Sequence, residues 1–255
     1  MTRGRGEIIA VAGKGGVGKT LISALLVKFL SERERILAID ADPATSLPSA
    51  LGVRVRKTLG DVREEIAAPS RVPFDESLPI DVLLEHKIDE IMVRTPRFSL
   101  IAMGRSEGPG CYCLINDMLR HFIDRLSGRF PKVVVDCEAG LEHLSRRTVR
   151  DVSTLLVVSD PTVRGLETAK SIRGIAESLQ IRFDRIYLVL NKVAGELDAL
   201  EDKIKETGLE LVGVVPEDEL VREYDFVGKP LIELPEDCKA ASAVRDIVRH
   251  LFGSG

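Results

Sequence analysis

The chain has 255 residues, and its 36 basic and 40 acidic side chains give a formal net charge of −4. Hydrophobic residues make up 44% and charged residues 30%, a composition that excludes disordered chains, collagen and disulfide scaffolds. No apolar run approaches the roughly 18 residues of a membrane span, and the first residues do not resemble a secretory signal. The four cysteines therefore favour a reducing, cytoplasmic compartment. The acidic balance disfavours binding of nucleic acid through broad phosphate neutralisation.

Short, almost wholly apolar runs alternate with helical patterns along the chain, as is typical of strands covered on both faces. We predict strands over Ile8–Ala12, Ile36–Asp40, Phe98–Met103, Val133–Asp136, Leu155–Ser159, Ile186–Asn191 and Leu211–Val215. We predict helices over Lys19–Leu30, Leu114–Leu126, Gly165–Leu179 and Leu197–Glu206. This alternation indicates an α/β fold with a doubly wound, mostly parallel sheet. Residues 1–255 are expected to form a single domain, in which the part 44–97, with short helical pieces separated by prolines, is an elaborated connection between the second and third strands.

A glycine-rich segment follows the first predicted strand and opens the first predicted helix. It fits the pattern GxxxxGK[ST], with the residues Gly13, Lys14, Gly15, Gly16, Val17, Gly18, Lys19 and Thr20. Glycines let backbone N–H groups converge on phosphate oxygens. Lys19 supplies a charge to the β- and γ-phosphates, and the Thr20 hydroxyl is a ligand for Mg²⁺. The segment predicts a nucleotide-binding P-loop.

The additional lysine, Lys14, makes the loop GKGGVGKT similar to the deviant Walker A motif of the MinD/nitrogenase iron protein superclass of P-loop ATPases. The resemblance implies that Lys14 reaches the partner's nucleotide across a homodimer interface, so that ATP closes the dimer. Asp42, in Asp40–Pro43, resembles the switch I acid that orients the attacking water and contacts Mg²⁺ through water. Asp136 resembles the Walker B acid, and Gly140 the hinge whose N–H senses the γ-phosphate. Lys14, Lys19, Asp42 and Asp136 are thus the expected catalytic residues.

The base is expected to lie beside Asn191 and Lys192, which end the sixth predicted strand where this superclass recognises the base. A guanine-specific motif would carry aspartate two residues after the lysine, and this chain has Ala194 there. The sequence therefore favours adenine, with Asn191 and the loop of Pro216, Glu217 and Asp218 as expected base contacts.

Two cysteines, Cys111 and Cys113, stand one residue apart after Gly-Pro-Gly and open a predicted helix. A disulfide at this spacing is strained, and a helix start lowers the pKa of a thiol towards the metal-binding thiolate. One such pair is half a site, but a symmetric dimer brings four thiolates together, which suits Ni²⁺, Zn²⁺ or an iron–sulfur cluster. The alternative is a small apolar cluster that packs a helix start.

The segments EGPGCYC, with the following Asn116 and Leu119-Arg120, and DCEAGLEHLSRRT (136–148) resemble the CooC-type carbon monoxide dehydrogenase maturation ATPases. The resemblance covers nearly the whole chain. It implies a homodimeric ATPase that binds metal through Cys111 and Cys113 at the dimer interface. Its client would be the carbon monoxide dehydrogenase apoenzyme, into which it helps to insert nickel. The sequence leaves open which metal is bound and whether the related acetyl-CoA synthase is the client instead.

Two other functions within the superclass are alternatives. An iron–sulfur electron donor would need a second cluster cysteine seven residues after Asp136, where this chain has His143, a supplementary metal ligand or a structural residue. A membrane-positioning ATPase of the MinD type would use a basic amphipathic C-terminal helix. The apolar stripe over Val244–Phe252 has that spacing but few basic neighbours, so we expect it to pack on the sheet. Cys137 is expected to be buried packing, and no function is assigned to Cys238.

Overall fold

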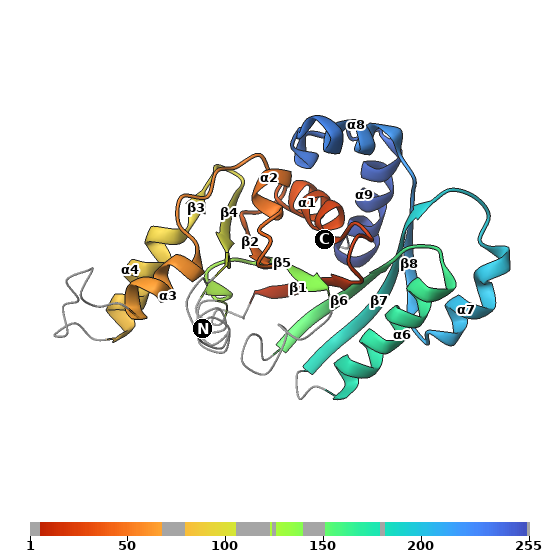
Figure 1. Ribbon diagram of the computed structural model, residues 1–255, viewed down its shortest axis with the longest axis horizontal. Helices are drawn as coiled ribbons and strands as arrows, with labels where there is room; N and C mark the ends of the chain where they lie inside the picture. Colours follow the sequence, from red (N-terminus) through yellow and green to blue (C-terminus); the bar gives the residue numbers. More distant parts are fainter. Residues whose placement is uncertain are drawn as a thin grey trace.

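The computed structural model describes residues 6–67, 80–105, 123, 126–139, 151–178 and 182–253. Its centre is an eight-stranded sheet with the strand order β3-β4-β2-β5-β1-β6-β7-β8 (Figure 1). The strands are β1 (Glu7–Gly13), β2 (Ile36–Ala41), β3 (Val93–Arg94), β4 (Phe98–Ala102), β5 (Lys132–Ala139), β6 (Asp151–Ser159), β7 (Arg182–Val193) and β8 (Glu210–Pro216). All pairings are parallel except the one between β3 and β4. The prediction of a mostly parallel, doubly wound sheet is therefore confirmed.

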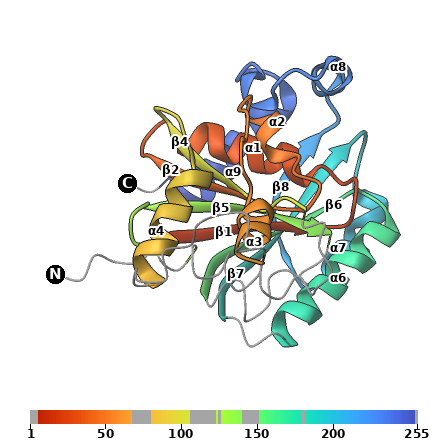
Figure 2. The same ribbon diagram turned by 60° about the vertical axis from the view of Figure 1, so that its left-hand side comes forward.

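Helices cover both faces of this sheet, as Figure 2 shows. The α-helices are α1 (Lys19–Leu30), α2 (Leu47–Ala50), α3 (Leu59–Ala67), α4 (Ile80–Ile91), α6 (Val163–Ser178), α7 (Glu201–Glu206), α8 (Glu219–Val227) and α9 (Lys239–Phe252). Two short 3₁₀ helices, η2 (Asp198–Leu200) and η3 (Leu231–Glu233), complete the described elements. One buried cluster joins the sheet to α1, α2 and α9, and a second joins its opposite face to α3, α4 and α6. The two-sided cover explains why the central strands are apolar almost throughout.

The predicted elements agree with this architecture at most positions. Helix α1 has the predicted bounds, and the pattern over 197–206 divides into η2 and α7. The predicted helix over 114–126 lies outside the described residues except for Ile123 and Leu126, which are helical and buried. The connection over 44–97 contains α2, α3 and α4, in agreement with the short helical pieces expected there, and the short antiparallel strand β3, which was not predicted.

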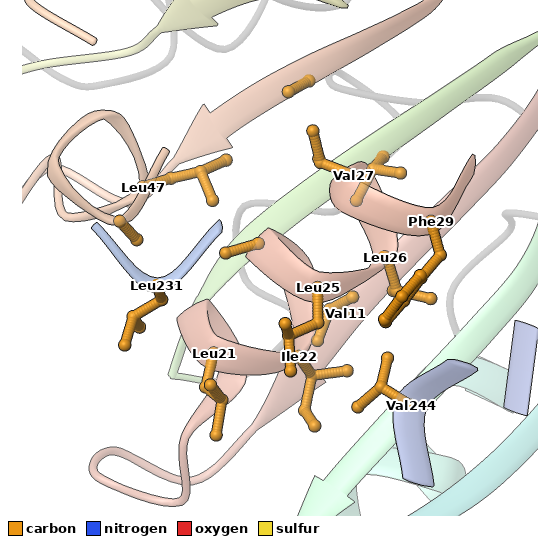
Figure 3. Close-up of a cluster of buried hydrophobic side chains, with 14 of the residues drawn as sticks. Val11, Leu21, Ile22, Leu25, Leu26, Val27, Phe29, Leu47, Leu231 and Val244 are labelled. Carbon is orange, nitrogen blue, oxygen red and sulfur yellow. The ribbon is translucent and has the colours of Figure 1, made fainter. Parts of the chain in front are cut away.

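Helix α1 is buried on nearly all sides, between the sheet, α9 and the segment around η3 (Figure 3). Figure 3 shows Leu25 and Ile22 directed towards Val11 of β1 and Val244 of α9. A helix that is apolar all round is held as part of the core. Its first turn, where the P-loop ends, is therefore fixed by the packing of the whole helix.

Helix α9 presents its apolar stripe to the interior, as the sequence analysis predicts. Val244 and Ile247 are buried, and the helix packs against β8 and α1. Within the part of the chain that the structure describes, no helix combines the length and the apolarity needed to cross a bilayer.

Candidate nucleotide site

The residues predicted to bind nucleotide converge at the carboxyl edge of the parallel strands. A cavity of about 660 Å³ opens there, beside the P-loop and α8. We call one side the loop wall, formed by Gly15, Gly16, Gly18, Lys19 and Thr20, and the opposite side the helix wall, formed by Val221, Tyr224, Asp225, Gly228 and Lys229. Asp42, Ser46 and Glu138 line the same cavity. Carboxyl ends of parallel strands at a switch in strand order are where ligands bind in such sheets.

The P-loop is held from behind by two side chains of β7. The Asn191 amide donates to the Val17 carbonyl over 2.7 Å, and the Lys192 ammonium donates to the Gly16 carbonyl over 2.8 Å. Gly18 has φ +93°, and a Cβ atom there would lie 2.2 Å from Asn191 Nδ2. Asn191 and Lys192 are thus positioning residues for the loop, a role that the sequence analysis did not assign. Their contact with the base remains a prediction.

The start of α1 has the features of a phosphate site. Gly18 provides no side-chain cap, and the first turn carries no acidic residue. Lys19 is buried, its ammonium donates to the Lys14 carbonyl over 3.2 Å, and no carboxylate forms an ion pair with it among the described residues. Free helix-start N–H groups and an unpaired ammonium suit a polyanion. The side chain of Lys14 itself is exposed on the loop.

A network of oxygen atoms lies next to this phosphate site and fits Mg²⁺. The Thr20 hydroxyl donates to Asp136 Oδ2 over 2.8 Å, and the Ser23 hydroxyl donates to Oδ1 over 2.9 Å. The Ser46 hydroxyl lies 3.1 Å from that of Thr20. Burial raises the pKa of Asp136 to about 6 although both hydroxyl donors oppose the shift. A nearby divalent cation would favour the charged carboxylate, so Thr20 and Asp136 are the expected holders of the ion.

Asp42 stands on a loop that a buried carboxylate holds in place. Asp40 accepts hydrogen bonds from the backbone N–H groups of Asp42, over 3.0 Å, and Leu47, over 2.9 Å. Asp42 in turn accepts one from the N–H of Ala44 and lines the cavity. Burial, with a smaller contribution from the charge of Asp136, raises the pKa of Asp40 to about 7. Asp40 is a positioning residue that the sequence analysis missed. The sequence feature that could have identified it is an acidic residue near the end of an otherwise apolar strand.

The residues predicted to contact the base line a second cavity, of about 270 Å³. Asn191, Lys192, Pro216, Glu217 and Asp218 all border it. Leu21, Lys192, Val221 and Asp225 line both cavities and mark the passage between them. The structure thus places the predicted base residues next to the predicted phosphate residues.

Asp218, which borders this second cavity, links two helix starts through hydrogen bonds. Its two oxygens accept hydrogen bonds from the N–H groups of Leu220 and Ala240, each over 3.0 Å, and so join the starts of α8 and α9. Burial opposes ionisation, but these N–H groups outweigh it and lower the pKa of Asp218. Glu217 forms an ion pair with Arg222. Contact of either acid with the base remains a prediction.

The predicted metal-binding residues Cys111 and Cys113 lie outside the described residues, as do Gly140 and His143. Cys137 is fully buried beside Asp136, and burial raises the pKa of its thiol, which confirms the prediction of packing. Over the ranges that the structure describes, no group of three or more His, Cys, Asp or Glu residues could hold a metal ion.

Comparison with known proteins agrees with this geometry. Residues 8–231 match the CbiA family, described as the CobQ/CobB/MinD/ParA nucleotide binding domain. The uncharacterized ATP-binding protein MJ0685 of Methanocaldococcus jannaschii is 46% identical over 251 residues, which cover 96% of this chain and 98% of that relative. The carbon monoxide dehydrogenase accessory protein CooC of Rhodospirillum rubrum is 34% identical over 245 residues, which cover 91% of each chain.

Solved structures agree at the level of the fold. The septum site-determining protein MinD of Pyrococcus horikoshii OT3, in complex with Mg-ADP, superposes with a TM-score of 0.73. The alignment covers 96% of each chain at 22% sequence identity.

Proposed function

This chain belongs to the CobQ/CobB/MinD/ParA family and is an ATPase, and from that premise we propose that it serves the maturation of carbon monoxide dehydrogenase. ATP closes a homodimer, Cys111 and Cys113 of two chains bind a transition metal at the interface, and the protein assists nickel insertion into the client apoenzyme. The observation that carries this proposal is the 34% identity to CooC over 91% of the chain. The paired cysteines of the sequence supply the ligand chemistry that such a role needs.

Hydrolysis rests on the residues around the larger cavity. Backbone N–H groups of the P-loop bind the phosphates, and Lys19 pairs with the β- and γ-phosphates. Thr20 and Asp136 would hold Mg²⁺, which neutralises charge that develops on the phosphoryl oxygens. Asp42 orients the attacking water, since its carboxylate is an acceptor fixed at the cavity by Asp40. Lys14, exposed on the loop, is free to extend to a partner's nucleotide.

Nucleotide state then determines the metal site. The γ-phosphate favours closure through contacts with Lys14 and the residues around Asp42, and hydrolysis removes that bias. Because a site formed by two chains exists only in the dimer, metal favours association and ATP changes metal affinity. One nucleotide state would hold nickel and the other would release it to the client.

The two alternatives differ in what they require of this chain. A membrane-positioning ATPase needs an amphipathic C-terminal helix with a free apolar stripe, whereas Val244 and Ile247 of α9 are buried against the fold. An iron–sulfur electron donor needs a further cluster ligand in place of His143. Both remain outcomes of the experiment below.

The test is a titration of anaerobically purified protein with Ni²⁺, by calorimetry, together with sedimentation velocity with and without ATP. We expect one metal per two chains, loss of the metal in Cys111→Ser/Cys113→Ser, and ATP-dependent dimers. Cys238→Ser is the matched control, because that half-buried cysteine lies outside the pair. The wild type, and not the double variant, should raise the activity of nickel-free carbon monoxide dehydrogenase.

Three results would overturn the proposal. A stoichiometry of one metal per chain that is retained in Cys111→Ser/Cys113→Ser would exclude a metal site at the dimer interface. A visible absorption band that depends on Cys111 and Cys113 would favour the electron donor. Sedimentation with liposomes only in the presence of ATP would favour membrane positioning.

A further inference from the structure

The helix wall brings a lysine to the nucleotide cavity that no motif predicts. Gly228 ends α8 with φ +68°, and the N–H of Lys229 donates to the Tyr224 carbonyl over 2.8 Å. This turn directs Lys229 along Tyr224, with its ammonium 4.5 Å from the centre of the aromatic ring. Tyr224 is the buried residue of α8, so the ammonium is held over a fixed surface.

The charge of Lys229 is uncompensated. Lys203 and Lys205 of α7, in contrast, form ion pairs with Glu206 and Glu201. Among the described residues, no carboxylate lies within 4.0 Å of the Lys229 ammonium, and Tyr224 offers only the face of its ring. A cation that lines a cavity without a partner attracts an anion to that cavity.

The position of Lys229 indicates which part of the nucleotide it meets. It lines the cavity that contains Lys19, Thr20 and Asp42, and it is absent from the border of the base cavity. The passage between the two cavities runs past Val221 and Asp225, one turn or more before Lys229 on the same helix wall. Lys229 therefore lies in the cavity of the expected phosphate-binding residues, away from the residues expected to contact the base.

We propose that Lys229 is a phosphate-binding residue that pairs with the nucleotide from the side opposite the P-loop. The triphosphate then lies between two ammonium groups, Lys19 on the loop wall and Lys229 on the helix wall. Because Lys229 is bonded to the end of α8, its pairing with phosphate also draws the end of this helix towards the nucleotide. The inference rests on ATP binding alone and is independent of the role in carbon monoxide dehydrogenase maturation.

The test compares ligands of decreasing charge on Lys229→Met, which keeps most of the side-chain stem and removes the ammonium. Affinities for ATP, ADP, AMP and adenosine are measured by competition against a fluorescent adenine nucleotide. Loss of a charged hydrogen bond predicts about tenfold weaker ATP binding, a smaller loss for AMP, and unchanged adenosine binding. Lys229→Arg should stay within about threefold of the wild type for every ligand, because it keeps the charge.

The controls separate charge pairing from packing. Lys170→Met removes an exposed lysine of α6 that lines neither cavity and should leave all affinities unchanged. Lys229→Gln repeats the measurement if the methionine variant does not fold. Equal losses for ATP and adenosine would assign Lys229 to the packing of Tyr224 and overturn the proposal. Unchanged ATP affinity would overturn it as well, whereas a wild type that binds no ATP would contradict the ATPase assignment itself.

Discussion

The loop wall and the helix wall face each other across one cavity but are held in different ways. Behind the loop wall stand buried polar side chains, Asn191 and Asp136, bonded to the P-loop and to the first turn of α1. Helix α8 contributes Tyr224 as its buried residue, and Phe226 and Val227 on it are 92% and 69% exposed. The loop wall is therefore preorganised for phosphate, whereas the helix wall has few contacts that a bound nucleotide must break in order to move it.

The largest difference between the walls should appear in ATP binding. Lys19→Ala removes the buried, unpaired ammonium of the loop wall, and we expect ATP affinity to fall at least about 100-fold, since charged hydrogen bonds are the strong ones. Titration calorimetry measures this loss. Lys192→Met removes the bond to the Gly16 carbonyl and a cation from the cavity lining, but it leaves Lys19 in place, so affinity should fall less than about tenfold. Equal losses in the two variants would contradict the role given to Lys19.

The second prediction concerns hydrolysis, which should depend on one side of the cavity only. Asp42→Asn keeps an oxygen for the Ala44 N–H but loses the carboxylate, so we expect kcat to fall at least about 100-fold while ATP affinity changes little. Asp225→Asn changes a carboxylate of the helix wall and should keep kcat within about threefold. Steady-state kinetics and equilibrium binding together check both variants. Normal hydrolysis by Asp42→Asn would show that another group orients the water.

The third prediction compares two glycines with left-handed backbone. Gly18→Ala strains the loop wall and displaces the Asn191 amide, so its cost should be about 3 kcal/mol of the free energy of unfolding. Gly228→Ala meets no atom within 4 Å, and its cost should be about 1 kcal/mol. Urea denaturation measures both values. In an Asn191→Ala background the cost of Gly18→Ala should drop to about 1 kcal/mol, and an unchanged cost would show that the contact is unimportant.

The fourth prediction uses two aspartates that each accept two backbone N–H bonds. The pKa of Asp40, raised to about 7 from an ordinary 3.8, makes the folded state hold its proton more tightly than the unfolded chain. Without nucleotide or Mg²⁺, stability should therefore fall as the pH rises from about 4 to 7, by roughly 4 kcal/mol, and Asp40→Asn should reduce this fall.

Asp218 should behave in the opposite way, because its folded pKa is lowered. Its contribution to stability is present above the ordinary pKa and is lost as the pH falls through the lower folded value. Asp218→Asn should therefore destabilise the protein equally at pH 5 and 7.5, when unfolding by urea is measured at both. If the loss of unfolding free energy in Asp218→Asn changed between pH 5 and 7.5, as we expect for Asp40→Asn, the opposite pKa directions of the two aspartates would be refuted.

The smallest effect belongs to the helix wall. Tyr224→Phe removes a hydroxyl that donates to the Glu233 carbonyl over 3.4 Å, a long bond, and keeps the ring under Lys229. We expect a change in unfolding free energy below about 0.5 kcal/mol and unchanged ATP affinity. Thermal unfolding and calorimetry check this, and a loss of several kcal/mol would mean that the helix wall is held as firmly as the loop wall.

Sequence patterns predicted the loop wall well because its information is local. The apolar run of β1, the glycine spacing and the apolar helix after Lys19 are contiguous, and their periodicity identifies them. Strand β3 has two residues and α2 has four, which is too short for any periodicity. Helix α8 was not predicted although its sequence ELVREYDFV is amphipathic, because nine residues give only a short pattern.

The hydrogen bonds behind the site were beyond prediction for another reason. Ser23 acts through Asp136, 113 residues further along the chain, which only the assembled sheet brings near. Asp40 has local partners, the N–H groups of Asp42 and Leu47, but its burial depends on the packed sheet. Asn191 was singled out for the base, but its bond to the P-loop depends on the register of β7 beside β6. Pairings across the sheet are a property of topology, which a local pattern does not contain.

The long separation between the P-loop and its supports has a consequence for synthesis on the ribosome. Val17 and Asn191 are 174 residues apart in the chain, and Thr20 and Asp136 are 116 apart. The loop emerges from the ribosome first. The Asp136 carboxylate, which accepts from Thr20, follows after about half of the chain has been made, and the Asn191 amide, which donates to the Val17 carbonyl, follows later still. Ordering of a glycine-rich loop costs conformational entropy that these distant contacts must offset. A nascent chain therefore acquires its nucleotide site late, after β7 has joined the sheet, and bound ATP then stabilises a domain that is already almost complete.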